Sequence, residues 1–284
     1  MFHTRSALLL GCGYVAKATA PLLIAQGFDV IGTTRSPEKA VKLDAAGIRP
    51  LVNPDVKALG DAMAASTHIL VSAPPGENGD PFLAMMDRSA DLPRLDWLGY
   101  LSTTGVYGDA GGGWVDETTP PNPIDDRSRR RLAAEQGWQV LSDCVWIFRL
   151  AGIYGPGHSA LERVRDGTAR RIIKADHVFS RIHVDDIATA LMASMARPDV
   201  TGPFNLADAE PSSQAETVAF AAQLLGVDPP PLEDFGSAEM SPMLRSFYAA
   251  SRRVSSEVTQ NTLGWALKYP NYRDGLRAIY AASI

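Results

Sequence analysis

The sequence Ala7-Leu-Leu-Leu-Gly-Cys-Gly-Tyr-Val-Ala16 carries the clearest structural signal in the chain. Its apolar run Ala7–Leu10 is short and ends at Gly11, which is typical of a buried strand. A helix pattern follows from Val15 to Gln26, and Gly27 is a typical helix end. The glycine turn therefore joins a strand directly to a helix, which is the context that a phosphate-binding turn requires.

The spacing of the small residues in this turn predicts a dinucleotide site. Gly11 allows the tight turn, and Gly13 lets the backbone approach a pyrophosphate because no Cβ is in the way. Ala16 is small enough for the helix to pack closely on the sheet. The helix N-terminus then presents free N–H groups and its positive dipole end to phosphate. We expect the cofactor to bind at Gly11, Gly13, Tyr14, Val15 and Ala16; the alternative is a glycine turn that binds nothing.

The end of the second predicted strand, Asp29–Thr33, indicates which dinucleotide binds. NAD sites usually place Asp or Glu about 20 residues after the glycine turn, where it bonds the ribose 2′-hydroxyl. Here that region reads Gly32-Thr-Thr-Arg-Ser36 and contains no acid. Arg35 suits a 2′-phosphate instead, assisted by the hydroxyls of Thr34 and Ser36. The sequence therefore favours NADP, with NAD second; the alternative is that Arg35 is an exposed loop arginine.

Strand and helix patterns alternate through the first half of the chain, which predicts βαβ units and a parallel sheet. After the first strand, further strands are expected at Asp29–Thr33, Ile48–Val52, His68–Ser72, Trp97–Ser102 and Val145–Leu150. The helices between them are expected at Glu38–Ala46, Val56–Ala65 and Arg127–Leu141. Pro50, inside the third strand, favours a position at the edge of the sheet.

The second half of the chain is less regular and predicts a smaller lobe. Helix patterns occur at Ser159–Asp166, Ile187–Arg197, Ser213–Leu225, Tyr248–Gly264 and Tyr272–Ser283. Asp185 or Asp186 is expected to cap the second of these helices. We predict an α/β fold, a doubly wound parallel sheet (Rossmann) with a smaller C-terminal substrate lobe. Residues 1–155 would form the dinucleotide-binding domain and 156–284 mainly the substrate lobe, with 179–208 returning to the first domain.

The amino-acid composition argues against several classes of protein. The 284 residues carry 27 Lys+Arg against 32 Asp+Glu, a net charge of −5, whereas general nucleic-acid binders are usually basic. Cys12 and Cys144 are too few for a disulfide framework or a zinc cluster, and the histidines show no metal-binding spacing. Leu9-Leu-Gly-Cys12 resembles a lipoprotein cleavage box, but the apolar run before it is too short for a signal sequence. We therefore expect a cytoplasmic protein with no nucleic-acid or membrane partner.

Five further segments, together with the glycine turn, resemble the extended or atypical short-chain dehydrogenase/reductases, in their epimerase/dehydratase-like branch. They occur in that family's order and spacing, and the resemblance covers about residues 7–210. The segments are Leu101-Ser-Thr-Thr-Gly-Val-Tyr-Gly108, Val115-Asp-Glu117, Arg149-Leu-Ala-Gly-Ile-Tyr-Gly-Pro-Gly157, Ser180-Arg-Ile-His-Val-Asp-Asp-Ile187 and Phe204-Asn-Leu-Ala-Asp208.

The resemblance implies catalytic positions that this chain fills in an unusual way. In the family, a Tyr four residues before a Lys is the general acid/base, and a Ser or Thr shares its hydrogen bond. Thr103 matches the Ser/Thr. Alignment on Leu132-Ala-Ala-Glu135 places Arg127 at the Tyr position and Arg131 at the Lys position. Arg127 cannot transfer the proton, since a guanidinium group is not deprotonated in proteins. Arg131 could bond a ribose hydroxyl, or both arginines could bind an anionic substrate; alternatively they form a solvated basic helix end.

Other residues are candidates for the missing proton donor. Tyr107 is the nearest tyrosine after Thr103, although the resemblance implies that it packs rather than reacts. Asp116 and Glu117 could act if burial raised the pKa of either carboxyl, but turn formation or substrate binding suits them better. His183 is expected to be a structural hydrogen-bonding residue.

Two more segments are expected to contact the cofactor. Ser72, Ala73 and Pro74 follow the fourth strand and would lie at the adenine side. By resemblance, Leu150 and Ile153 would touch the nicotinamide end.

These observations predict an NAD(P)-dependent oxidoreductase or a sugar-nucleotide-epimerase/dehydratase-like protein that acts on a small polar, even anionic, substrate. The proton donor is unassigned. An alternative is a non-catalytic NADP(H)-binding redox sensor or regulatory protein, and a third is a scaffold whose dinucleotide site is vestigial. By resemblance, the chain would be a monomer or a homodimer formed through the helix at 127–141.

Overall fold

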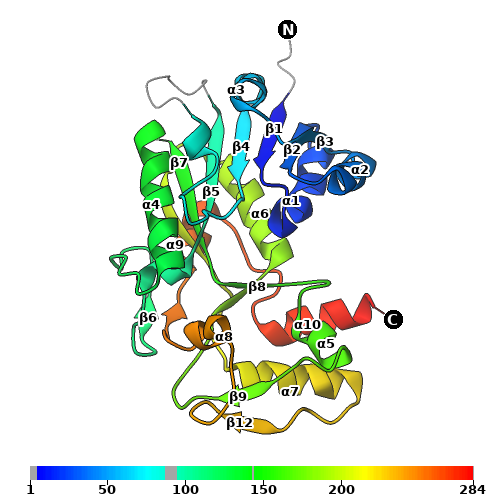
Figure 1. Ribbon diagram of the computed structural model, residues 1–284, viewed down its shortest axis with the longest axis vertical. Coiled ribbons are helices and arrows are strands. Elements are labelled where there is room, and N and C mark those ends of the chain that lie inside the picture. The colour runs from blue at the N-terminus through cyan, green and yellow to red at the C-terminus, as the bar shows by residue number, and fades with distance from the viewer. Residues whose placement is uncertain (1–4, 87–94, 143, 284) are drawn as a thin grey trace.

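The computed structural model describes residues 5–86, 95–142 and 144–283. Its centre is a seven-stranded parallel sheet with the order β11-β7-β5-β4-β1-β2-β3 (Figure 1). The order reverses between β1 and β4, which makes the sheet doubly wound and confirms the predicted fold class. The strands are β1 (Ser6–Leu10), β2 (Asp29–Thr34), β3 (Arg49–Val52), β4 (His68–Val71), β5 (Trp97–Thr103), β7 (Val145–Leu150) and β11 (Gly202–Leu206).

Helices cover both faces of this sheet, so its strands are apolar on both sides. One core cluster joins the sheet to α1 (Tyr14–Ala25) and α6 (Val184–Met195) and includes the buried ring of Trp97. A second cluster, on the opposite face, joins it to α3 (Val56–Ala64) and α4 (Asp126–Leu141). The smaller helices α2 (Pro37–Ala45) and α9 (Glu257–Leu263) flank β3 and β11.

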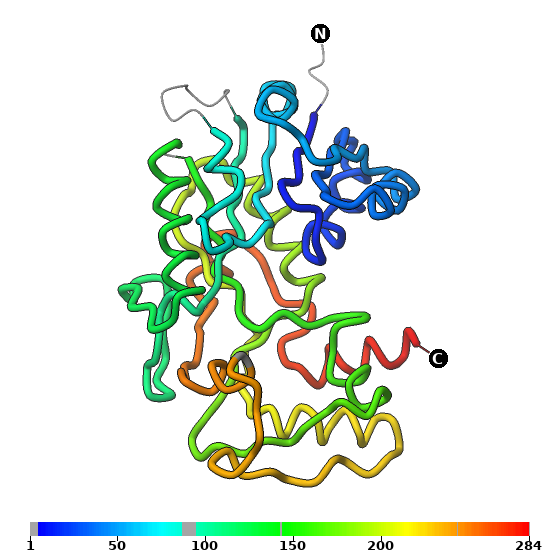
Figure 2. The backbone as a smooth tube through the Cα atoms, viewed as in Figure 1, coloured from blue at the N-terminus to red at the C-terminus, as the bar shows by residue number. Residues whose placement is uncertain are grey.

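A smaller lobe lies at the end of the sheet where the strands terminate (Figure 1). Its helices α5, α7 and α10 share a small core that contains Leu161, Ala221 and Leu276. The chain passes between the two parts several times: after β7 it enters the lobe, and α6 and β11 lie again with the sheet (Figure 2). The lobe helices are α5 (Ala160–Arg165), α7 (Gln214–Leu225), α8 (Pro242–Phe247) and α10 (Tyr272–Ala281).

Short segments complete the connection between sheet and lobe. They include three two-stranded parallel pairs and two 3-10 turns. The pairs are β8 (Gly152–Tyr154) with β10 (Arg181–His183), β9 (Arg171–Ile173) with β12 (Leu232–Asp234), and β6 (Trp114–Val115) with β13 (Arg253–Val254), and the turns are η1 (Leu83–Met85) and η2 (Thr104–Tyr107). Within the described part of the chain, no helix is long and apolar enough to cross a lipid bilayer.

Two local predictions were wrong, and one was confirmed. Within the predicted helix pattern Tyr248–Gly264, only α9 is helical, and residues 248–256 are not. Helix α8 lies before this pattern, and Ser241 caps its start. Helix α6 begins at Val184, capped by His183 instead of an aspartate, because the His183 imidazole accepts the N–H of Asp185. Pro50 does lie in an edge strand, as predicted.

Candidate functional site

The turn after β1 has a geometry that only glycine fits at its first position. Gly11 has φ +86°, and a Cβ there would lie 2.7 Å from the Cβ of Ala73. The Gly11 N–H donates to the Thr33 hydroxyl at 2.6 Å, and the Cys12 N–H donates to the Thr33 carbonyl at 3.0 Å. The turn is therefore tied to the end of β2 on one side and packed against the end of β4 on the other.

Gly13 shapes the entrance to α1. It is the N-cap residue of that helix, and no side chain caps it. A Cβ on Gly13 would meet no atom within 4 Å, so this position opens outward. Val15 and Ala16 are buried, so they can contribute only backbone N–H groups to a ligand. An open glycine and uncapped N–H groups at a helix N-terminus fit a dinucleotide pyrophosphate.

Tyr14 links the glycine turn to the lobe, a contact that the sequence did not reveal. Its hydroxyl donates to the Pro156 carbonyl at 3.0 Å, and its ring lies 5.5 Å from that of His158. Burial raises the pKa of Tyr14 to about 12, with smaller contributions from nearby carboxylates. Tyr14 therefore remains protonated and acts as a hydrogen-bond donor between the sheet domain and the lobe.

The end of β2 presents one unpaired cation. Arg35 is exposed, and within the described part of the chain its guanidinium has no ion pair or hydrogen bond. The hydroxyls of its two neighbours already make hydrogen bonds within the protein. The Thr34 hydroxyl accepts the Ser36 N–H at 3.2 Å, and the Ser36 hydroxyl caps α2 and bonds Glu38. The Arg35 guanidinium is thus available to bind a phosphate. The Ser36 hydroxyl already has two partners, so it is less available to a ligand than the sequence suggested.

The segment after β4 lies beside the glycine turn. The N–H groups of Ser72 and Ala73 both donate to the Leu10 carbonyl, at 2.9 and 3.0 Å. Ala73 contacts Gly11 as described, and Pro74 is exposed beyond it. These residues adjoin the reversal of strand order, where ligands of open α/β sheets bind.

Thr103 ends β5 at the same edge of the sheet. Its hydroxyl accepts the Gly105 N–H at 3.1 Å, and a Cβ on Gly105 would lie 2.7 Å from the Ser128 hydroxyl oxygen. The first turn of α4 is therefore packed against this strand end. Leu150 pairs with Thr103 in register, but its side chain is buried, while Ile153 is half-buried in β8.

The two arginines that the resemblance aligns with a Tyr and a Lys have different surroundings. Arg127 is exposed, and its guanidinium lies 5.5 Å from the ring centre of Phe247 in α8. Arg131 donates to the Leu101 carbonyl at 2.5 Å and lies over the ring of Tyr100. The structure thus separates the pair: Arg131 supports β5, and Arg127 reaches toward the lobe.

Tyr107 belongs to a buried polar network rather than to the site's surface. Its hydroxyl donates to Asn205 Oδ1 at 2.8 Å and accepts from Arg149 at 3.1 Å. Arg149 forms a buried ion pair with Glu135, which also accepts the Ser102 hydroxyl. Burial raises the pKa of Tyr107 above its ordinary value, against the opposing effect of Arg149. With both functions of its hydroxyl engaged, Tyr107 does not suit proton transfer.

Asp116 and Glu117 also have structural partners. Asp116 accepts from the backbone and hydroxyl groups of Thr118 and Thr119, which lowers the pKa of its carboxyl. Glu117 accepts the Asn205 N–H at 3.1 Å and the Thr259 hydroxyl at 2.6 Å. Both carboxylates therefore hold a turn and its neighbours in place.

Two buried titratable groups lie between the sheet and the lobe. His183 is buried, and burial lowers the pKa of its imidazole to about 4, so the ring that caps α6 is neutral. Asp208 is 1% exposed, and neither carboxyl oxygen makes a hydrogen bond of ordinary geometry with a described residue. Burial raises the pKa of Asp208 to about 8. The sequence pattern does not indicate that Asp208 is buried.

The raised pKa of Asp208 predicts that the free energy of unfolding depends on pH. Its pKa is about 8 in the folded chain against an ordinary 3.8, so the folded state binds the extra proton between these values. Stability therefore falls as the pH rises through that window, by at most ~1.4 kcal/mol per pH unit. We expect Asp208→Asn to remove this slope and to be more stable than the wild type near pH 8. Urea unfolding between pH 4 and 8 measures the change of unfolding free energy with pH, and the exposed Asp61→Asn is the control. Equal pH slopes for Asp208→Asn and Asp61→Asn would show that Asp208 does not cause the dependence.

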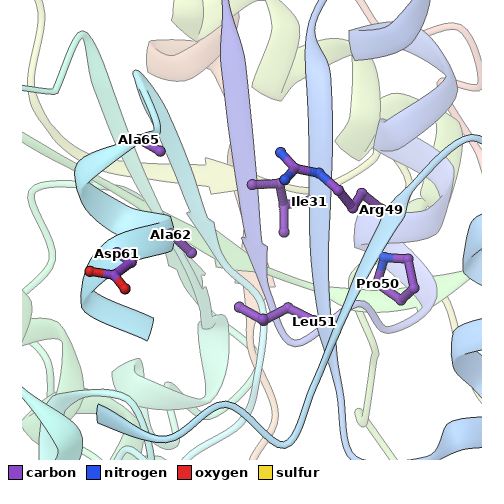
Figure 3. Close-up of a pocket in the computed structure, with 7 residues that line it drawn as sticks. All are labelled: Ile31, Arg49, Pro50, Leu51, Asp61, Ala62 and Ala65. Carbon is purple, nitrogen blue, oxygen red and sulfur yellow. The ribbon is translucent and has the colours of Figure 1, made fainter. Parts of the chain in front are cut away.

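The structure also has a half-open hollow of about 270 Å³ beside β2, β3 and α3 (Figure 3). Its charged residues are already paired: Arg49 with Asp29 at 2.7 Å and Asp61 with Lys57 at 2.6 Å. It contains no residue predicted for the site. It is lined by Ile31, Arg49, Pro50, Leu51, Asp61, Ala62 and Ala65.

The sheet order, the glycine turn and the uncapped N-terminus of α1 define a doubly wound α/β protein of the Rossmann fold. A solved structure, a conserved protein of unknown function from Silicibacter pomeroyi, is 44% identical with a TM-score of 0.89, over 98% of this chain and 99% of that one. The chain belongs to the same family as that protein. The human epimerase family protein SDR39U1, solved with NADPH, shares the fold at 19% identity and a TM-score of 0.76, over 98% and 99% of the two chains.

Curated relatives are more distant. Protein YeeZ of Escherichia coli K12 is 28% identical over 242 residues, which are 78% of this chain and 84% of YeeZ. The 3-diazoavenalumate denitrifying reductase of a Streptomyces species is 29% identical over 182 residues, 57% of this chain and 58% of the reductase. No protein-family model matches the chain.

Proposed function

We propose that this chain binds NADP(H) at the glycine turn and acts as an NAD(P)-dependent oxidoreductase of the epimerase/dehydratase-like type on a small polar substrate. The observation that carries the proposal is the open Gly13 at the uncapped start of α1, at the same sheet edge as Thr103. Two similarities support it: the human fold neighbour was solved with NADPH, and the Streptomyces relative is named a reductase.

The proposed preference for NADP over NAD rests on Arg35. Its guanidinium is free of protein partners in the described chain, and charge-assisted bonds to phosphate are strong. We expect Arg35→Ala to weaken NADPH binding about tenfold, or ~1.4 kcal/mol, and to leave NADH binding unchanged. Fluorescence titration of both nucleotides measures this, with exposed Arg129→Ala as the control. Equal losses for NADPH and NADH would show that Arg35 does not bind the 2′-phosphate.

Thr103 is the side chain best placed to act on a substrate oxygen. A bound reduced nicotinamide supplies a hydride to a carbonyl carbon. The Thr103 oxygen accepts the Gly105 N–H, and among the described residues its own proton has no acceptor. That proton can therefore be donated to a carbonyl oxygen, and solvent replaces it. Arg127 does not take part in this proton transfer, because guanidinium groups do not give up a proton in proteins.

A non-catalytic NADP(H) sensor is the second candidate function. The observation that favours it is the absence of a proton donor at the family's Tyr position, where Arg127 lies over Phe247 instead. Tyr107 does not replace that donor, because its hydroxyl is engaged on both sides. A sensor needs tight binding and unequal affinities for the oxidised and reduced cofactor, without turnover.

NADPH oxidation with a panel of carbonyl compounds separates the two functions. An oxidoreductase is expected to oxidise NADPH with at least one class of carbonyl compound, and Thr103→Val is expected to slow this at least about tenfold. NADPH binding with no oxidation across the panel would favour the sensor. Absence of binding would leave the vestigial scaffold.

A further inference from the structure

Arg127 occupies an electrostatically unfavourable position. It is the second residue of α4, and the positive end of a helix dipole favours anions there and disfavours cations. Its neighbours on the helix have partners: Arg129 pairs with Asp126 at 3.1 Å, and Arg131 bonds the Leu101 carbonyl. In the described chain, Arg127 has no carboxylate within ion-pair distance. The nearby Asp125 carboxylate attracts Arg127 electrostatically, but its hydrogen bonds include the Ser128 N–H at 2.9 Å and the Ser128 hydroxyl at 2.8 Å.

The Arg127 guanidinium lies against an exposed aromatic ring from the other part of the molecule. Phe247 ends α8 of the lobe, is 51% exposed, and has its ring centre 5.5 Å from the guanidinium carbon. The two residues therefore bridge the first turn of α4 and helix α8 of the lobe. Within the described chain the Arg127 guanidinium makes no hydrogen bond or ion pair, so its N–H donors remain available to an anion.

The backbone of the first turn of α4 lies close to the residue proposed to contact the reacting oxygen. Ser128, which follows Arg127, has its hydroxyl 2.7 Å from the Cβ position of Gly105, and Gly105 bonds Thr103. A ligand that binds an anionic group on Arg127 would thus begin at the start of α4, beside the Thr103 end of β5. The exposed part of the Phe247 ring would flank the rest of the ligand.

We propose that Arg127 and Phe247 bind the substrate, and that the substrate is a carboxylate with a flat apolar body. The carboxylate would accept from the Arg127 N–H donors, and the body would pack on the Phe247 ring. This inference deepens the proposed function and rests on it for the reaction, but the binding itself can be tested separately.

The test uses a matched pair of probes, 4-carboxybenzaldehyde and its methyl ester, titrated calorimetrically into the full chain with and without NADP⁺. We expect the acid to bind at least about tenfold more tightly than the ester. Arg127→Gln is expected to abolish this preference, and Phe247→Ala to weaken both probes alike. Arg129→Gln, on the same helix, is the control and should change neither affinity.

Three results would overturn the inference: equal binding of acid and ester, an Arg127→Gln variant that behaves like Arg129→Gln, or no binding of the acid at millimolar concentration. NADPH titration of the same samples keeps the two proposals apart. Arg127 is outside the glycine turn, so we expect NADPH affinity to stay within about twofold in Arg127→Gln. A chain that binds the acid but no dinucleotide would refute the proposed function and retain the carboxylate site.

Discussion

Gly13→Val is expected to weaken NADPH binding by about 100-fold or more, or ~2.7 kcal/mol, without lowering the thermal unfolding temperature. The backbone at Gly13 is extended, with φ −86° and ψ −156°, which other residues adopt, and a Cβ there meets no protein atom within 4 Å. The valine side chain would instead fill the space over the start of α1 that the pyrophosphate needs. The variant should therefore fold normally and fail to bind.

Two further glycine variants control this prediction. Gly60 in α3 also has open space around its Cβ position, so Gly60→Val should leave NADPH binding unchanged. Gly11→Ala should lose stability as well as binding, because of its positive φ and the contact with Ala73. If Gly13→Val bound NADPH like the wild type, the glycine turn would not be the pyrophosphate site.

Glu135→Leu is expected to lower the free energy of unfolding by about 3–5 kcal/mol. The Glu135 and Arg149 side chains are 3% and 7% exposed, and Glu135 Oε2 accepts from Arg149 Nη2 at 2.9 Å. Glu135 Oε1 also accepts from Arg149 Nε at 3.2 Å and from the Ser102 hydroxyl. Removal of the carboxylate leaves the Arg149 charge buried without compensation. Urea unfolding measures the loss.

The double variant Glu135→Leu/Arg149→Met tests whether the uncompensated Arg149 charge causes this loss of stability. Because it removes both charges, it should recover part of the stability that the single variant loses. The Lys57–Asp61 pair is a matched surface control, with side chains 83% and 68% exposed, and Asp61→Asn should cause no measurable change. A single variant as stable as the wild type, or a double variant less stable than the single, would contradict the role given to this pair.

The sequence predicted the features of the fold that are local. The strand, turn and helix around Gly11 and Gly13 lie within a few residues, and the alternation of apolar strands and helices continues to Val145–Leu150. The short pairs such as β8 with β10 have only three residues each, too few to show a period. Helix α8 was missed because its six residues give a weak pattern.

Residues of the candidate site were predictable only where a single segment of the chain determines their surroundings. The surroundings of Tyr107 depend on Arg149 and Asn205, which are 42 and 98 residues away in sequence. The contact between Arg127 and Phe247 joins two segments that no local pattern relates. Asp208 follows an apolar strand, and nothing nearby in the sequence indicates that its carboxyl is buried.

Both proposed functions depend on the binding of NADP(H) at the glycine turn. Fluorescence titration of the apo protein with NADPH and NADH, with NADP⁺ and NAD⁺ as competitors, tests it most directly. We predict that NADPH binds at least about tenfold more tightly than NADH, a preference of ~1.4 kcal/mol. The absence of any dinucleotide binding at micromolar concentration would contradict this binding, and with it both the oxidoreductase and the sensor.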